Sequence, residues 1–198
     1  MGAVGKNSSD SVVVHDEQQL RYALSKSEDQ IRYDDTETAV VYDQDGNLLL
    51  NKNQGIVDEV SFTAAEAQLF SDAIFTHNHP SGNTFSAADI QTAVYTGIKE
   101  MRACYYIYSN GEFSSGAYVL TRDYDIGDKI PSSYLNFAQD YQNAMDGYKT
   151  DTVDPVWNNS SQTNADAKKC NTMISDFRKQ WLHDNSSKYG WVYKEEKK

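Results

Sequence analysis

Two histidines stand two residues apart in the stretch His77-Asn78-His79-Pro80, and Asp89 lies ten residues after His79. A short apolar run, 73–76, precedes them, and the alternation of side chains along a strand would direct both imidazoles to one face. Two imidazole nitrogens and one carboxylate oxygen leave a fourth coordination position to water, which is the open arrangement of catalytic zinc sites. The spacing therefore predicts one zinc ion held by His77, His79 and Asp89.

Hydrolytic chemistry at such a site needs two further groups, a proton shuttle and a partner for an oxyanion, because zinc itself only activates water and polarises a carbonyl. Ser86, one helical turn before Asp89, is the candidate oxyanion partner. Glu37 is the leading candidate for the shuttle, and Glu59 and Glu66 stay open as alternatives because they too precede the histidines. Taken alone, Ser86 and Asp89 also have the pattern of an ordinary helix start.

Period-two apolar patterns and turn signals predict the strands. A hairpin around Asp45-Gly46 is expected because glycine tolerates the positive φ of a tight turn. The expected strands are 38–43, 48–51, 57–62, 73–76, 104–108, 117–121 and a last short one at 189–193, with Asn110-Gly111 joining the fifth to the sixth.

Helical spacing of apolar residues predicts the remaining elements. Thr63 and Ser86 have the residue types of N-caps, with an acidic residue three positions later in each case. The expected helices are 16–31, 63–72, 86–101, 134–148 and 170–181, with an irregular stretch at 150–161.

This order of elements predicts an α/β (α+β) fold, a mixed β-sheet flanked by helices. We expect three parts: a tail and short helix in residues 1–30, a metal-binding core in 31–125, and a helical extension in 126–198 that packs on the core. A chain of 198 residues with 39% hydrophobic residues suits one principal core.

The net charge of −11 argues against a nucleic-acid groove and against attachment to an anionic membrane, since both depend on clustered lysines and arginines. No apolar run approaches the roughly 20 residues of a membrane helix, and the polar start MGAVGKNSSD is unlike a signal peptide. The composition predicts a cytoplasmic protein. Cys104 and Cys170 are expected to be buried reduced thiols, and His15 and His183 to be surface residues.

The motif resembles the JAB/MPN metallopeptidase-like superfamily, whose signature is an upstream glutamate, then His-x-His-Pro, then Ser-x-x-Asp. The sequence HNHPSG of His77 to Gly82 is similar to that of RadC-like and phage-associated bacterial members. Residues 37–43 with the Asp45-Gly46 turn resemble the glutamate-bearing strand pair of those members. The resemblance spans residues 37–121. It implies a JAB/MPN, cytidine-deaminase-like architecture, zinc bound by His77, His79 and Asp89, Glu37 as general base and acid, and Ser86 as oxyanion partner.

Two functions follow from this resemblance. The first is a zinc-dependent hydrolase of peptide or isopeptide bonds, with a protein or peptide as its substrate. The alternative is a non-catalytic assembly or interaction module of phage or mobile-element origin, because the superfamily contains both kinds. A DNA-acting role by analogy with RadC-like relatives is weakened by the acidic charge. The identity of the substrate, the oligomeric state and the role of the C-terminal helices stay open.

Overall fold

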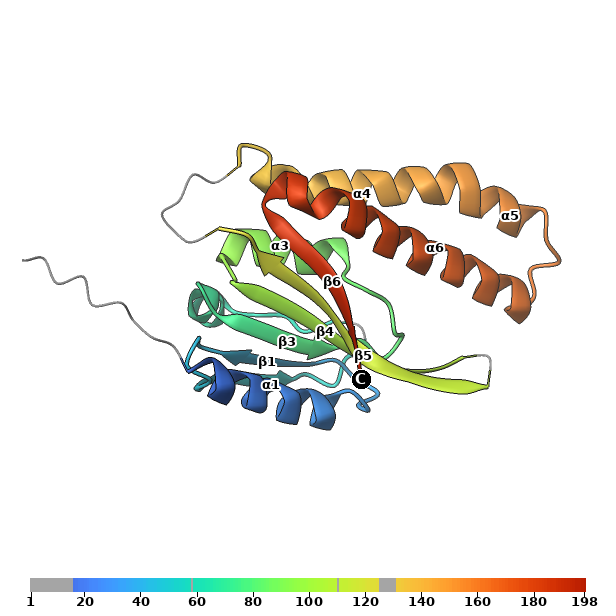
Figure 1. Cartoon of the computed structure of the whole chain (residues 1–198). Coiled ribbons are helices and arrows are strands. Elements are labelled where there is room, and N and C mark those ends of the chain that lie inside the picture. The colour runs from blue at the N-terminus through green and yellow to red at the C-terminus, as the bar shows by residue number, and fades with distance from the viewer. Residues whose placement is uncertain (1–15, 58, 110, 125–130) are drawn as a thin grey trace, which may run out of the picture.

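A computed structural model describes residues 16–57, 59–109, 111–124 and 131–198. Within these ranges six strands form one sheet in the order β2-β1-β3-β4-β5-β6 (Figure 1). The strands are β1 (Thr38–Tyr42), β2 (Leu48–Asn53), β3 (Ile74–Asn78), β4 (Glu100–Ser109), β5 (Glu112–Arg122) and β6 (Trp191–Lys197). Neighbouring strands are antiparallel except β3 and β4, which are parallel and are connected through α3 (Ala87–Thr96). The expected mixed sheet flanked by helices is confirmed.

Helices cover both faces of the sheet. α1 (Glu17–Ile31) lies on one face, and α3, α4 (Phe137–Tyr148) and α6 (Asn164–Asn185) lie on the other (Figure 1). Alternation along β3 divides its side chains between these layers, so that Ile74 belongs to the apolar cluster under α1 and Phe75 to the cluster under α3. His77, two residues after Phe75, therefore points to the α3 face.

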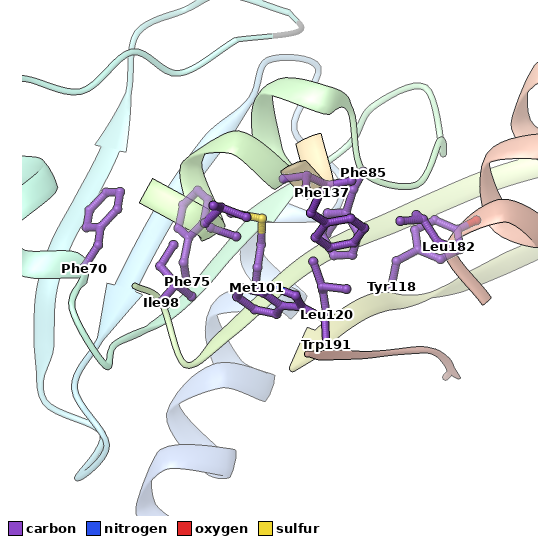
Figure 2. Close-up of a cluster of buried hydrophobic side chains, with 14 of the residues drawn as sticks. Phe70, Phe75, Phe85, Ile98, Met101, Tyr118, Leu120, Phe137, Leu182 and Trp191 are labelled. Carbon is purple, nitrogen blue, oxygen red and sulfur yellow. The ribbon is translucent and has the colours of Figure 1, made fainter. Parts of the chain in front are cut away.

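The C-terminal elements share one apolar core with the strands. Figure 2 shows Phe137, Leu182 and Trp191 beside Phe85, Leu120 and other side chains of the sheet region, and all five are fully buried. Burial of a large apolar side chain stabilises a fold by about 1.5–3 kcal/mol. These contacts therefore fasten α4, α6 and β6 onto the sheet, whereas the division of the chain at residues 30 and 125 stays a prediction.

Local turn and capping signals are confirmed. Gly46 has a φ of +82° between β1 and β2, and a Cβ there would lie 2.9 Å from backbone atoms of Leu20. Thr63 and Ser86 each cap a helix through a reciprocal pair of hydrogen bonds with the acidic residue three positions on. The first of these helices, α2 (Ala64–Ala67), continues as a 3-10 turn over Gln68–Phe70.

The expected strand at 57–62 is wrong for its described residues. Residues 59–62 form no strand, because Ser61 N–H donates to the Gln54 side chain at 2.7 Å instead of to a neighbouring strand, while Val60 and Phe62 pack against the core. The helix expected to reach residue 101 ends at Thr96, since Gly97 adopts the left-handed conformation that terminates helices. Ile98 therefore follows the helix, and Met101 lies in β4.

The stretch 150–161, expected to be irregular, is helical for most of its length. A π-helical turn at Lys149–Val153 continues from α4 into α5 (Asp154–Asn158), where Pro155 occupies the first turn, a position that tolerates its missing N–H. α6 begins earlier than expected, at Asn164, and 3-10 turns at Tyr134–Asn136 and Ser186–Tyr189 flank the pair.

β4 and β5 are longer than expected and pair as far as Ser109 with Glu112, while Asn110 of the predicted turn lies outside the described residues.

Both cysteines are buried and unpaired, as expected. No helix in the described part of the chain combines the length and the apolar character needed to cross a membrane.

Candidate metal centre

Four of the five candidate residues converge at one point. One ligand atom from each of Glu37, His77, His79 and Asp89 lies within 4.8 Å of all the others. The two histidine Nε2 atoms are 2.9 Å apart, and Asp89 places one carboxylate oxygen 3.5 Å from His77 Nε2 and the other 3.6 Å from His79 Nε2. Glu37 Oε1 lies 3.9 Å from His77 Nε2. The cluster could hold a metal ion.

Strand register brings Glu37 and the histidines together. β1 and β3 are antiparallel with Ala39 opposite His77, so Glu37, two residues before Ala39, faces the same side of the sheet. The backbone N–H of His79 donates to the Cys104 carbonyl at 2.9 Å, which continues the pairing of β3 with β4 by one residue. The extended backbone therefore keeps both imidazoles on the α3 face, as the sequence predicted.

Asn78, between the two histidines, fixes the backbone around Glu37. It is fully buried, and its side-chain carbonyl accepts from the N–H of Thr38 at 2.7 Å. Its amide donates to the carbonyls of Thr36 and Asp34, each at 3.1 Å. The side chain thus holds the residues on both sides of Glu37, so that the element carrying the histidines also positions the glutamate.

The loop after His79 sets the orientation of its ring. His79 Nδ1 lies 2.7 Å from the Asn83 carbonyl, and a carbonyl can only accept, so Nδ1 carries the proton and Nε2 presents a lone pair to the cluster. Gly82 allows this turn, with a φ of +72° and with Ile107 Cγ2 only 2.1 Å from where a Cβ would stand. Any other residue type would therefore be strained at this φ and would require the Ile107 side chain to move.

Ser86 and Asp89 fix one another at the start of α3. Asp89 Oδ2 accepts from the Ser86 backbone N–H at 2.6 Å and from Ser86 Oγ at 2.8 Å, and Ser86 Oγ accepts from the Asp89 N–H at 3.2 Å. This capping box leaves Oδ1 facing His77. The ordinary helix start and the candidate ligand position are therefore the same structure.

Three tyrosines from other elements form hydrogen bonds with residues 82–85 of the loop after His79. Tyr118 of β5 donates to the Gly82 carbonyl at 3.2 Å, and Tyr141 of α4 donates to the Phe85 carbonyl at 2.8 Å. The hydroxyl of Tyr193 in β6 is hydrogen-bonded to Thr84 Oγ1 at 3.0 Å. The C-terminal elements thus contribute to the shape of the loop that orients His79.

Electrostatics in the cluster favour a bound cation. Burial opposes protonation of His77, but the hydrogen bond and charge of Asp89, together with the charge of Glu37, raise its pKa. Burial and the neighbouring His77 lower the pKa of His79 to about 4. Burial disfavours the Asp89 carboxylate, but the hydrogen bond from His77 and the charges of both histidines lower its pKa. When no metal is bound, these shifts favour a proton on His77 over one on His79.

The donor set fits a divalent ion. Ligand atoms at the corners of a tetrahedron around zinc, with bonds of about 2.0–2.1 Å, lie about 3.3–3.4 Å apart. The two Nε2 atoms are 2.9 Å apart, and the Asp89 carboxylate lies 3.5 Å from His77 through Oδ1 and 3.6 Å from His79 through Oδ2, which is close to these separations. Within the described ranges no lysine or arginine forms an ion pair with Asp89. An ion could replace the proton on His77 with only small movements of the side chains.

A pocket of about 350 Å³ opens above the cluster and gives solvent access to it. Its lining includes Glu37, His79, Ser86 and Asp89, while His77 lies beneath with no exposed surface. Arg178 of α6 forms part of its wall. Solvent and small molecules can therefore reach Glu37, His79 and Asp89 through this pocket.

The alternative glutamates lie elsewhere. Glu59 lines the same pocket but is exposed, outside the four-residue cluster, and accepts a hydrogen bond from Ser61 Oγ at 2.6 Å. Glu66 pairs with Lys52 at 2.8 Å, an interaction that lowers the Glu66 pKa to about 2. His183 is exposed beside Asp184, as predicted for a surface residue, and His15 lies outside the described residues. Glu37 is the only one of the three glutamates in the cluster.

Sequence reasoning missed Asn78, Tyr141 and Arg178 as parts of the site. Asn78 could have been suspected from its place between the histidines, since a buried asparagine needs backbone partners. Tyr141 and Arg178 carry no local signal, because they reach the site only through the packing of α4 and α6.

Comparison of the chain with protein-family models found no match, and comparisons with curated proteins and with solved structures found no significant match either. The arguments about function therefore rest on the geometry of the cluster.

Proposed function

We propose that the protein is a zinc-dependent hydrolase of peptide or isopeptide bonds, with a site of the JAB/MPN type. The observation that carries the proposal is the convergence of Glu37, His77, His79 and Asp89 on the floor of a pocket that Ser86 also lines. This set contains each residue type of the motif in the order of the resemblance, and the loop between Pro80 and Ser86 is slightly shorter than in the peptidase members that the motif resembles. His77, His79 and Asp89 would hold the ion.

When bound, zinc supplies a Lewis acid that lowers the pKa of water and polarises a carbonyl group. Glu37 Oε1, 3.9 Å from His77 Nε2, takes a proton from the attacking water and returns it to the leaving amine. Ser86 Oγ lies beside Asp89 in the pocket lining, and its one hydroxyl proton, which Asp89 Oδ2 accepts in this structure, would turn to the oxyanion that forms. Asn78 keeps Glu37 in place during both proton transfers.

The test compares Glu37→Gln with Glu59→Gln, two identical substitutions in the same pocket. Glutamine preserves the shape of glutamate but takes no proton from water at neutral pH. We expect Glu37→Gln to keep one equivalent of zinc by elemental analysis and to lose about 10²- to 10⁴-fold of the rate on fluorogenic peptide and isopeptide substrates. Glu59→Gln is expected to keep both the equivalent of zinc and the rate of hydrolysis.

The reverse pattern, with loss of rate in Glu59→Gln alone, would assign the shuttle to Glu59. A zinc-loaded parent protein that cleaves no member of a broad panel of peptide and isopeptide substrates would contradict the hydrolase proposal and favour an interaction module instead.

A further inference from the structure

Arg178 of α6 places a positive charge in the wall of the metal pocket. The described lining of this pocket contains three carboxylates, Glu37, Glu59 and Asp89, and Arg178 is its only lysine or arginine. The resemblance to JAB/MPN proteins ends at residue 121, so the arginine comes from a part of the chain outside the motif. Its presence beside three acidic groups needs a physical reason.

The guanidinium has no partner in the described part of the chain. Arg178 forms no ion pair or hydrogen bond there, and its Nε is shielded from solvent without an acceptor. A buried donor left unsatisfied costs about 1–3 kcal/mol, and native proteins retain few of them. The carboxylates of the pocket lie beyond salt-bridge distance of Arg178, so they do not neutralise it.

Helix packing holds Arg178 close to the metal ligands. Leu182, one turn further along the same side of α6, is fully buried in the core next to Tyr118 (Figure 2). The Arg178 charge is among the influences that lower the pKa of His79, after burial and the neighbouring His77. It also acts on Tyr141, whose hydroxyl holds the loop beside the cluster. The arginine is thus fixed next to the cluster on a rigid element.

We propose that Arg178 binds a carboxylate group of the substrate close to the bond that is cleaved. This inference rests on the proposed function and specifies its substrates as peptides with an acidic group next to the scissile bond. A planar guanidinium forms paired hydrogen bonds with a carboxylate, which supply the acceptors that Arg178 lacks in the protein. The positive charge of Arg178 would also offset the repulsion that Glu37 and Glu59 exert on an anionic ligand.

The carboxylate has two sources in peptides, the chain terminus and the side chain of an acidic residue. Three probes separate them: acetyl-Gly-Gly with a free terminus, acetyl-Gly-Glu amide, and the uncharged acetyl-Gly-Gln amide. We expect the zinc-loaded protein to bind one of the two anionic probes at least about tenfold more tightly than the glutamine probe by isothermal titration calorimetry. The tighter of the two anionic probes identifies the source.

The matched variants are Arg178→Gln and Lys179→Gln, adjacent residues with the same change of charge. Lys179 Nζ lies 5.1 Å from the centre of the Tyr118 ring and faces a different pocket. We expect Arg178→Gln to abolish the preference and Lys179→Gln to keep it, with zinc content and melting temperature unchanged in both. A parent protein that does not discriminate, or a preference that survives in Arg178→Gln, would overturn the inference.

Cleavage of the same probes, followed in parallel by chromatography, separates the two proposals. Discrimination by Arg178 without any cleavage would count against the proposed hydrolysis only. Cleavage without discrimination would count against the role of Arg178 only.

Discussion

The two faces of the sheet each bury a cluster of charged side chains, but the clusters are balanced differently. On the α1 face, Arg102 donates to Glu28 at 2.5 Å, to Glu100 at 3.0 Å and to Glu196 at 2.7 Å, and Arg21 adds a hydrogen bond to Glu100 at 2.8 Å. Burial opposes both charges, yet the pairing lowers the pKa of Glu100 and raises that of Arg102. Each of these carboxylates pairs with an arginine, whose charge is permanent.

On the α3 face, the described ion pairs of Asp89 are with His77 and His79 alone. The positive charge there is a proton that the histidines can lose, whereas a guanidinium keeps its charge at every physiological pH. The first cluster therefore fastens α1 and β6 to the sheet. The second can exchange its proton for a metal ion, which is why we assign function to it.

The largest expected difference between the faces is in metal affinity. His79→Ala removes a ligand atom, so we expect it to weaken zinc binding by more than the roughly 10- to 100-fold that changes around ligands cost. The fold is expected to survive, because the main core does not depend on the ion. Competition with a chromophoric chelator measures the affinity. Zinc binding equal to the parent would refute the assignment of the site.

The second difference is in stability. Glu28→Gln removes one of the three carboxylates that pair with buried Arg102, so we expect a loss of about 1–3 kcal/mol, less than the roughly 3–5 kcal/mol of a buried charge left without any partner. Glu17→Gln, on the same helix but exposed, is the control and is expected to change stability by less than about 0.5 kcal/mol. Urea denaturation measures both. If Glu28→Gln weakened zinc binding as much as His79→Ala, the two faces would not be independent.

A third effect is expected from Asn78, whose side chain holds the backbone on both sides of Glu37. Asn78→Ala leaves the Thr38 N–H and the Thr36 carbonyl without their partner, which we expect to lower the free energy of unfolding by about 1–3 kcal/mol. Zinc content should stay near one equivalent while hydrolysis falls, because Glu37 loses its support. Asn78→Asp keeps the acceptor for the Thr38 N–H, so its free energy of unfolding and its rate of hydrolysis should lie between those of Asn78→Ala and the parent. A fully active alanine variant would show that Glu37 is positioned by other contacts.

The smallest expected effect is the response to pH. Zinc displaces the proton of His77, whose pKa is raised, so affinity should rise about tenfold per pH unit until the pH passes that pKa. About one proton should be released at pH 6, as calorimetry in buffers of different ionisation enthalpy would show. Zinc binding at pH 6 without release of a proton would contradict a proton held on His77.

On the α1 face the lowered pKa of Glu100 acts in the opposite pH range. Its contribution to stability is complete above the ordinary value of 4.5 and is lost as the pH falls through the lowered value. The metal-free protein should therefore lose stability from this group only below about pH 4.5. Thermal melts of the parent and Glu100→Gln between pH 3 and pH 7 check this, since the variant should lack that part of the loss.

The sequence predicted the parts of the site that depend on neighbours in the chain. Glycine turns, capping boxes and strand alternation are set by local backbone geometry, so the hairpin at Gly46 and the convergence of His77 with His79 followed from a few residues each. The helix end was misplaced because Gly97 interrupts an apolar pattern that continues through Ile98 into β4.

Long-range packing decided what the sequence did not predict. The expected strand at 57–62 has apolar residues at the right period, but Ser61 donates to Gln54, and residues 59–62 pair with no strand within the described ranges. Arg178 lies 89 positions after Asp89 on a helix whose pattern predicts only an amphipathic face. Its place in the pocket follows from the docking of α6, which no local rule describes.

The tyrosines that hold the loop have a consequence for the order of assembly. Thr84 and its partner Tyr193 are 109 positions apart, so the segment that orients His79 gains its last support only when the end of the chain has docked. Contacts between residues so distant in sequence form late in folding, because closing long loops costs entropy before the contacts compensate. During synthesis, the histidines leave the ribosome well before β6 does. A nascent or truncated chain without β6 would therefore carry the whole motif without a preorganised site, and competence to hold the ion would mark a chain in which β6 has docked.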